Sequence, residues 1–218
     1  MRKAGLPRER RDRTEFYFLT RFFALNRFMA IAFKEWSLVC EALGKGEQSV
    51  ILRKGGIAEG RSGFGFEHRE FYLFPTWFHG QIEKIRKSEI SLPEQAPDSI
   101  VISHAASVEW CGRIGDKEIV HRLRDLHVLD DSVVEDRFVY DSGSGSLGGH
   151  GIHVAFVRIY RMEPSSVLDM EKGFGGCRSW IEIPDVDAVT MISVLSDEEH
   201  ERRRELFLRH LEGVEGSS

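Results

Sequence analysis

Short runs of β-branched and aromatic residues, most of them ended by glycine, proline or a polar turn, recur along this sequence. Such runs are typical of β-strands. They read QSVILR at 48–53, EFYLF at 70–74, SIVIS at 99–103, SVEWCGRI at 107–114, HVAFVRIYRM at 153–162 and, after a glycine turn, FGGCRSWIEI at 174–183. Their number and spacing predict a β-sheet rather than a bundle of helices.

Four other segments show helical signals. In MAIAFKEWSLVCEALGKG (29–46), apolar side chains recur three and four residues apart and a glycine follows, which predicts a helix. A second helix is expected over 116–129, with Asp116 as its N-cap and an apolar face directed to the core. WFHGQIEKIRK (77–87) predicts a short helix, and a capping box opens a terminal helix over 196–212.

These segments interleave without a strict βαβ alternation, and no internal repeat is evident. We therefore predict an α+β fold, a single domain with a mixed β-sheet flanked by helices, over residues 29–213. Residues 141–151, rich in glycine and serine, are expected to form a flexible loop. Residues 1–28 are interpreted as an N-terminal appendage, and we hypothesise that translation starts at Met29, so that this appendage is not translated natively.

Composition bounds the class of protein. At 218 residues and 41% apolar composition, the chain can bury a full core in one unit. No run approaches the roughly 20 apolar residues of a membrane span, so no membrane association and a cytoplasmic location are expected. The three cysteines, odd in number and far apart, predict reduced thiols.

Charge is unevenly distributed. Residues 1–28 hold eight Lys and Arg against three Asp and Glu, a net charge of +5 (8 − 3). Because the whole chain carries −5, the remainder carries −10 (−5 − 5). An acidic body argues against tight non-specific DNA binding, which depends on many cations neutralising phosphates. A small basic pocket remains compatible with this composition.

RKGG (53–56) lies at the end of an expected strand. Arg53 and Lys54, with the backbone N–H groups of Gly55 and Gly56, are the residue types of an anion-binding nest. The motif lacks the G-x-x-x-x-G-K-[ST] order of a nucleotide-binding P-loop. The alternative interpretation is a glycine hairpin that carries two solvated cations.

Two histidines flank the expected strand at 70–74. His68 and His79 are candidates for general acid or base, and Glu59 and Glu35 are the carboxylates that would support them. No H-E-x-x-H motif or Cys/His cluster occurs, so no metal ligands are assigned. The alternative is a pair of partly buried histidines that hydrogen-bond to backbone carbonyls.

The segment before the last expected strand supplies further ligand-binding candidates. Arg178 can grip an anion bidentately, Ser179 can add a hydroxyl, and Trp180 can pack in the core or stack on a planar ligand. Cys177 is a weaker candidate, because a lone cysteine is usually a small buried hydrophobe. Thr76, after the strand at 70–74, completes the set.

Five segments together resemble a known bacterial family. They are FKEWSLVCEAL, ILRKGGIAEG, HREFYLFPTWFH, VAFVRIYRMEP and GGCRSWIEI. In this order and spacing they are similar to the uncharacterised family called domain of unknown function 1802, over roughly Ala32 to Ile183. The resemblance implies no activity, since none is established for that family.

Two functions fit the candidate residues. The first is a binding module for an anionic ligand, such as a nucleotide, a modified base or a nucleic-acid end, held in a Lys/Arg/His pocket. The alternative is a phosphoesterase or nuclease-like hydrolase that acts on a phosphorylated substrate at the same pocket. Binding is favoured because the sequence displays no defined nucleophile or metal set. Cofactors and oligomeric state are not indicated.

Overall fold

Seven strands pair into one mixed sheet in the part of the chain that the computed structural model describes, residues 29–54, 64–86, 92, 96–139, 150–176, 178–186 and 190–212. The strands are β1 (Met29–Trp36), β2 (Val50–Arg53), β3 (Glu70–Thr76), β4 (Ser99–Ile114), β5 (Ile152–Asp169), β6 (Trp180–Pro184) and β7 (Thr190–Ser193). Their order is β2-β5-β4-β3-β1-β6, and β7 also pairs with β5. The β1–β3 pair is parallel and the other pairs are antiparallel.

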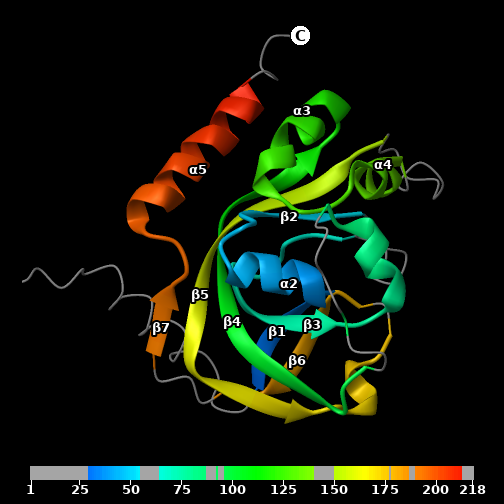
Figure 1. Cartoon of the computed structure of the whole chain (residues 1–218), viewed down its shortest axis with the longest axis vertical. Coiled ribbons are helices and arrows are strands. Elements are labelled where there is room, and N and C mark those ends of the chain that lie inside the picture. The colour runs from blue at the N-terminus through cyan, green and yellow to red at the C-terminus, as the bar shows by residue number, and fades with distance from the viewer. Residues whose placement is uncertain are drawn as a thin grey trace, which may run out of the picture.

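Four α-helices accompany the sheet in these residues: α2 (Ser37–Gly44), α3 (Lys117–Arg122), α4 (Asp131–Val139) and α5 (Asp197–Leu211). Short 3₁₀ helices are η2 (His79–Lys84), η3 (Leu123–Leu126) and η5 (Lys172–Phe174). Figure 1 shows the long strands β4 and β5 bending around α2, while α3 and α4 lie at one end and α5 runs along the outside. The predicted α+β single domain with a mixed sheet is confirmed.

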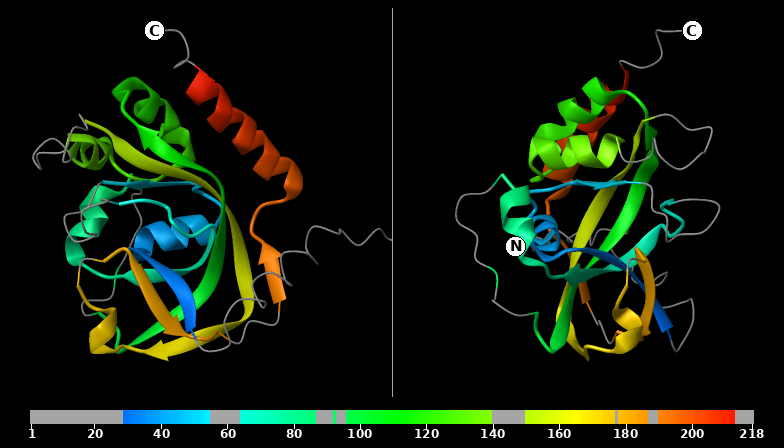
Figure 2. Two further views of the ribbon diagram at one scale, coloured as in Figure 1. Left: turned by 180° about the vertical axis from the view of Figure 1, so that it is seen from behind. Right: turned by 90° about the vertical axis from the view of Figure 1, so that its right-hand side faces the viewer.

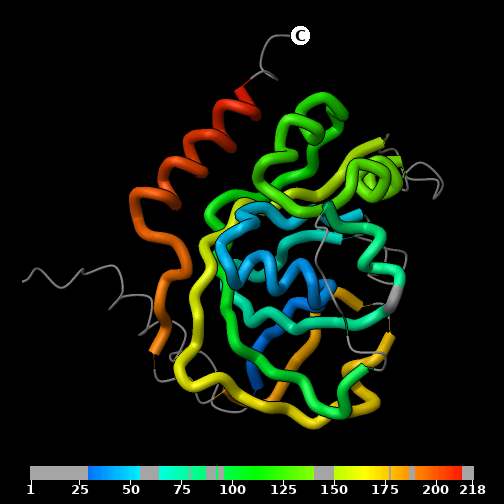
Figure 3. Tube along the Cα trace, viewed as in Figure 1, coloured from blue at the N-terminus to red at the C-terminus, as the bar shows by residue number. Residues whose placement is uncertain are grey.

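The two longest strands determine the curvature of the sheet. β4 and β5 pair from Ser99–Asp169 to Ile114–Ile152, and the register shifts twice, at Ile102/His104 and at Val108/Trp110. Such irregularities increase the local twist and bend a strand. Figure 2 shows the resulting bend from two further directions, and the trace in Figure 3 follows both strands along their whole length.

Buried side chains pack on both faces of the sheet. Because successive residues of a strand point to opposite faces, Ala32 and Phe33 of β1 belong to different apolar clusters. The larger cluster contains Phe33 and the buried residues of α2 and α3. Glu35 is two residues from Phe33 and therefore shares its face, whereas Lys34 lies on the opposite one.

One predicted helix was wrong over its first half. Residues 29–36 form the strand β1, and the helix α2 begins only at Ser37. β1 pairs with β3 on one side and with β6 on the other. Its four consecutive residues from Ala32 to Glu35 are all buried, so buried and exposed side chains do not alternate along it. A strand that is buried on both faces is not distinguished from a helix by periodicity.

Other element predictions changed in detail. The strands expected at 99–103 and 107–114 are one continuous strand, β4, and the helix expected at 77–87 is the short 3₁₀ helix η2. The strands at 48–53, 70–74 and 153–162 are confirmed as β2, β3 and part of β5. α4 and β7 were not predicted. The appendage at 1–28 and residues 141–149 of the expected flexible loop lie outside the described residues.

Helix caps agree with the sequence. The Asp116 side chain accepts hydrogen bonds from the backbone N–H groups of Glu118 and Ile119, and the Ser196 hydroxyl accepts from that of Glu199. Each cap satisfies N–H donors that a helix start leaves without an intrahelical partner. The apolar face expected over 116–129 is buried, with Ile119, Val120, Leu123 and Leu126 in the core.

The sheet curls until the strands at the two ends of its order approach each other. Arg53, the last residue of β2, donates a hydrogen bond of 2.7 Å to the hydroxyl of Ser179, which directly precedes β6. β2 and β6 do not pair through their backbones. We call this junction the seam and define it by Glu35, Arg53, Arg137 and Ser179.

Candidate functional site

Glu35 is a buried acid at the seam. Its side chain is fully enclosed, and the whole residue is 1% exposed. One carboxylate oxygen, Oε1, accepts a hydrogen bond of 2.9 Å from the Trp36 backbone N–H. The other, Oε2, has no hydrogen-bond partner within the described part of the chain. A buried acceptor without a partner is costly, and it often marks a functional position.

Two arginines approach this carboxylate from different elements. Arg53 Nη1 of β2 lies 3.7 Å from Glu35 Oε2, and Arg137 Nη2 of α4 lies 3.9 Å from Oε1. Both separations are within ion-pair range but exceed the usual hydrogen-bond length. Two guanidinium groups therefore face one carboxylate, which leaves one positive charge in excess among the described residues of the seam.

Each guanidinium is fixed by other contacts. Besides its bond to Ser179, Arg53 lies over the rings of Phe33 and Phe64, 5.2 and 5.9 Å from their centroids. Arg137 lies 4.5 Å from the centroid of the Trp36 ring and donates a hydrogen bond to the Leu52 carbonyl. Cation–π contacts of this kind hold a guanidinium in place without neutralising it.

Burial affects the titration of Arg137. Desolvation, with a smaller contribution from the neighbouring Arg53, lowers its pKa to about 10, and the Glu35 carboxylate acts in the opposite direction. The group still carries its charge at neutral pH. Desolvation, helped by the charge of Glu35, also raises the pKa of the buried Cys40 thiol well above its ordinary value, so this thiol is a poor nucleophile.

Trp180 is a packing residue. Its ring lies 4.7 Å from Phe33 and 5.1 Å from Phe71, between centroids, and its indole N–H donates to the Gly65 carbonyl. The half-buried His68 meets it edge-on at 4.9 Å. Of the two roles expected for Trp180, the structure displays core packing.

A buried lysine shapes the loop that leads to β6. Lys34 directs its ammonium to the carbonyls of Phe174, Gly175 and Gly176, at 2.8, 3.4 and 2.7 Å. Gly176 has a φ of +79°, a conformation that favours glycine. The backbone N–H of Lys34 also donates to the carbonyl of Ser179. Lys34 thus positions the loop that brings Ser179 to the seam.

Several predicted site residues meet at the seam. Glu35, Arg53 and Ser179 define it, and the Thr76 hydroxyl donates to the Glu35 backbone carbonyl at 3.0 Å. His68 is linked to it only through Trp180 and Phe33. These residues come from strands far apart in sequence, so the fold brings them together.

Other predicted residues do not take part in these contacts. Lys54 follows Arg53 and is exposed, and Arg178 precedes Ser179 and is also exposed. His79 begins η2, but its side chain lies outside the described residues, as do Gly55, Gly56, Glu59 and Cys177.

Arg137 and Trp36 contact the seam but were not among the predicted site residues. Arg137 belongs to α4, whose sequence DSVVEDRFV gave no clear helical stripe. Arg137 lies between the apolar residues Val134 and Phe138, and an arginine in an apolar setting is rarely buried unless it is paired. This pattern was a signal for a buried ion pair.

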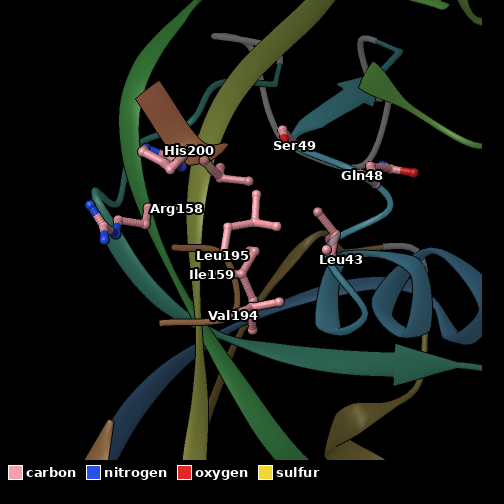
Figure 4. A pocket seen from close by; sticks show the side chains of 10 residues that line it. Leu43, Gln48, Ser49, Arg158, Ile159, Val194, Leu195 and His200 are labelled. Atoms are coloured by element: carbon pink, nitrogen blue, oxygen red, sulfur yellow. The ribbon is translucent and has the colours of Figure 1, made fainter. Parts of the chain in front are cut away.

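A small pocket elsewhere shares none of the seam residues. Figure 4 shows it between α2, β5 and the start of α5, with a lining of Leu43, Gly46, Gln48, Ser49, Val157, Arg158, Ile159, Val194, Leu195 and His200. Its polar side chains are engaged in the fold: His200 Nε2 lies 2.8 Å from Glu109 Oε1, and Arg158 bonds to Ser193 and Asp197. We assign this pocket to the packing of α5.

The described residues contain no group of three or more His, Cys, Asp or Glu side chains that could hold a metal ion. No helix in that same part of the chain is long and apolar enough to cross a membrane.

Comparison with known proteins gives a family match and two weak structural likenesses. A family model described as "Domain of unknown function (DUF1802)" matches residues 32–206. None of the curated proteins matches the chain. Crystal structures of ASCH from Zymomonas mobilis and of a serine-to-alanine mutant of it share 11% and 10% identity, with TM-scores of 0.41 and 0.39. Each covers 81% of this chain and 94% of the other chain, and these TM-scores are too low to support an argument.

Proposed function

Because the chain belongs to the family described as domain of unknown function (DUF1802), whose description assigns no activity, we propose its function from the seam. We propose a binding module for an anionic ligand such as a nucleotide, a modified base or a nucleic-acid end. In this proposal Arg53 is the main residue that binds the anionic group of the ligand. Lys54 and Arg178, exposed and adjacent in sequence to Arg53 and Ser179, are the accessory cations.

The observation that carries the proposal is the charge imbalance around Glu35. Two guanidinium groups share one carboxylate, and neither lies at hydrogen-bond distance from it. Burying an excess charge is costly unless an opposite charge compensates for it. A ligand that brings a negative charge to Arg53 would supply this compensation.

Arg53 is suited to this role by its placement. Its side chain is 20% exposed, so it reaches solvent, whereas Arg137 is almost entirely enclosed. A guanidinium has five N–H donors, and Ser179 accepts from one of its nitrogens. The contacts with Phe33 and Phe64 orient the group in advance, which reduces the entropy lost on binding.

The hydrolase alternative has less support. General acid–base catalysis requires a histidine or carboxylate within reach of the reacting group, and a His–carboxylate pair would be its usual sign. In the described residues such pairs include His200 with Glu109 and His121 with Glu135. Neither pair includes a predicted catalytic residue. His68 contacts the Trp180 ring instead.

Isothermal titration calorimetry of the whole chain tests the proposal, with nucleoside monophosphates and a 5′-phosphorylated oligoribonucleotide as ligands. Arg53→Ala should weaken binding by roughly 1.5–3 kcal/mol, the usual range for a hydrogen bond to a charged group. Arg53→Lys should restore binding only in part, because an ammonium lacks the planar fork. Arg178→Ala tests the accessory cation in the same way.

Arg202→Ala is the matched control, since Arg202 is an exposed arginine of α5 that pairs with Glu199. It should leave affinity unchanged. Thermal unfolding of each variant separates a lost contact from a lost fold. Binding by Arg53→Ala equal to that of the unmodified chain, or no binding of any of these anions, would reject the proposal.

A further inference from the structure

Phe78 exposes a large apolar ring beside the seam. The residue is 40% exposed, although phenylalanine is usually buried. Its ring meets that of Trp36 edge-on, with 5.2 Å between centroids and an interplanar angle of 68°. The Trp36 ring in turn lies 4.5 Å from the Arg137 guanidinium, which faces Glu35. The contacts run without interruption from the exposed ring to the charged group.

A fully buried glutamine fixes the backbone of the turn that carries this ring. The Gln81 amide nitrogen donates to the carbonyls of Thr76 and Phe78, at 3.3 and 3.2 Å. Its amide oxygen accepts from the Ser37 hydroxyl and the Leu38 N–H, both at 3.2 Å. Gln81 therefore joins the turn that carries Phe78 to the residues that follow Trp36. An exposed aromatic held so firmly is pre-organised for contact.

Two further contacts build the same turn. The Thr76 hydroxyl donates to the Glu35 backbone carbonyl, so the turn is also anchored to β1. A Cβ at Gly80 would lie 3.2 Å from Cε2 of Phe78. Glycine at position 80 therefore lets the Phe78 ring lie close over the backbone of η2. The segment PTWFHGQ (75–81) thus acts as one unit that presents the ring.

We propose that Phe78, supported by Trp36, is a stacking surface for the planar ring of the ligand, and that the ligand is a nucleoside 5′-phosphate, free or at the end of a nucleic acid. The inference rests on the proposed anion-binding function. A simple anion would need only the guanidinium groups, whereas a nucleotide also presents a π-face, which stacks on aromatic side chains whatever the base. Phe78 supplies the ring and Arg53 the charge, and contacts through Trp36, Arg137 and Glu35 connect the two.

Trp180, the stacking residue considered from sequence, is engaged elsewhere, and so is Trp77. The rings of Phe33, Phe71 and His68 surround Trp180, and Trp77 packs against the apolar cluster on the other face of the sheet. Phe78 is the aromatic next to the seam that combines exposure with a fixed position.

The test compares adenosine 5′-monophosphate with ribose 5-phosphate, which lacks the base, by calorimetry on the whole chain. The unmodified chain should bind the nucleotide roughly 5- to 150-fold more tightly, the effect of one stacked base. Phe78→Ala should remove this preference and leave ribose 5-phosphate binding unchanged. Phe78→Tyr should retain the preference, because it keeps the ring. Arg53→Ala should weaken both ligands.

Val167→Ala is the matched control, because Val167 is another exposed apolar residue, 65% exposed, in β5. A 5′-phosphorylated oligoribonucleotide that binds more tightly than the monophosphate, and is equally sensitive to Phe78→Ala, identifies a nucleic-acid end as the source. If Phe78→Ala weakens both ligands equally but the oligoribonucleotide binds no more tightly than the monophosphate, the free nucleotide is the source.

Equal affinity of the unmodified chain for the two small ligands would overturn the stacking surface, as would nucleotide binding unaffected by Phe78→Ala. Failure of both Phe78→Ala and Phe78→Tyr to bind either ligand would also overturn it, because Phe78 would then be needed for the fold. In these cases a persistent effect of Arg53→Ala leaves the anion-binding proposal standing. No binding of any of these phosphates rejects the anion-binding proposal itself.

Discussion

Replacing Glu35 by glutamine should destabilise the fold while it strengthens anion binding. Glutamine keeps an acceptor for the Trp36 N–H, so the change removes the charge alone. At 3.7 and 3.9 Å and an effective dielectric constant near 20, each arginine interacts with the carboxylate by about 4 kcal/mol before desolvation is counted. Breaking a buried ion pair by removing one partner costs about 3–5 kcal/mol.

For a chain of this size, such a loss lowers the melting temperature by roughly 6–20 °C. Urea unfolding and thermal denaturation measure it. Glu41→Gln is the matched control, because Glu41 is an exposed carboxylate that pairs with Lys45 along α2, and its change should stay within about 0.5 kcal/mol. The double variant Glu35→Gln/Arg137→Met should recover part of the loss, because it also removes the enclosed cation.

The single variant Glu35→Gln raises the net charge of the seam from one excess positive charge to two. Anion affinity should therefore rise in calorimetry although stability falls. Stability equal to that of Glu41→Gln would refute the view that the carboxylate compensates for the two guanidinium groups. Weaker anion binding in a folded Glu35→Gln protein would show instead that the carboxylate itself contacts the ligand.

Three further changes probe the scaffold. Lys34→Met should cost about 1–3 kcal/mol in urea unfolding, because the carbonyls of residues 174–176 lose a donor. Burial, with the charges of nearby arginines, lowers the pKa of His127 to about 3 from 6.5, so the unfolded chain binds an additional proton between these values. Unfolding free energy should therefore fall by about 2 kcal/mol from pH 7 to pH 5 through this group, and His127→Asn should flatten that slope in pH-dependent urea unfolding. Ser196→Ala should cost about 1 kcal/mol, measured as a lower melting temperature, because it removes the cap of α5.

Local signals were sufficient where the structure depends on local contacts. The caps at Asp116 and Ser196 follow from side chains that bond two or three residues ahead, and the strands β2 and β3 follow from short β-branched or aromatic runs. β1 was mistaken for a helix because its conformation depends on pairing with β3 and β6. The residues of β1 pair with residues about 40 positions away in β3 and about 150 positions away in β6. The periodicity of a local segment carries no information about such distant partners.

The candidate site was predictable in part for a similar reason. Arg53, Glu35 and Ser179 were chosen by residue type, and the curl of the sheet brings them together. Arg137 was not chosen, because its place beside Glu35 follows from the packing of α4 on β2, which needs the whole fold. The exposure of Phe78 is likewise a property of the folded surface.

The contact between Arg137 and the Leu52 carbonyl closes an edge of the sheet inside the molecule. β2 pairs with β5 along one side only, so its other side is a strand edge. Edge strands with unused carbonyls invite strands from other molecules, and proteins commonly block them with a charged side chain. The guanidinium of Arg137 occupies the carbonyl of Leu52 on this edge. Because Leu52 is 1% exposed and the side chain of Arg137 is almost entirely enclosed, this edge is covered within the fold, and losing Arg137 would remove the donor to a buried carbonyl.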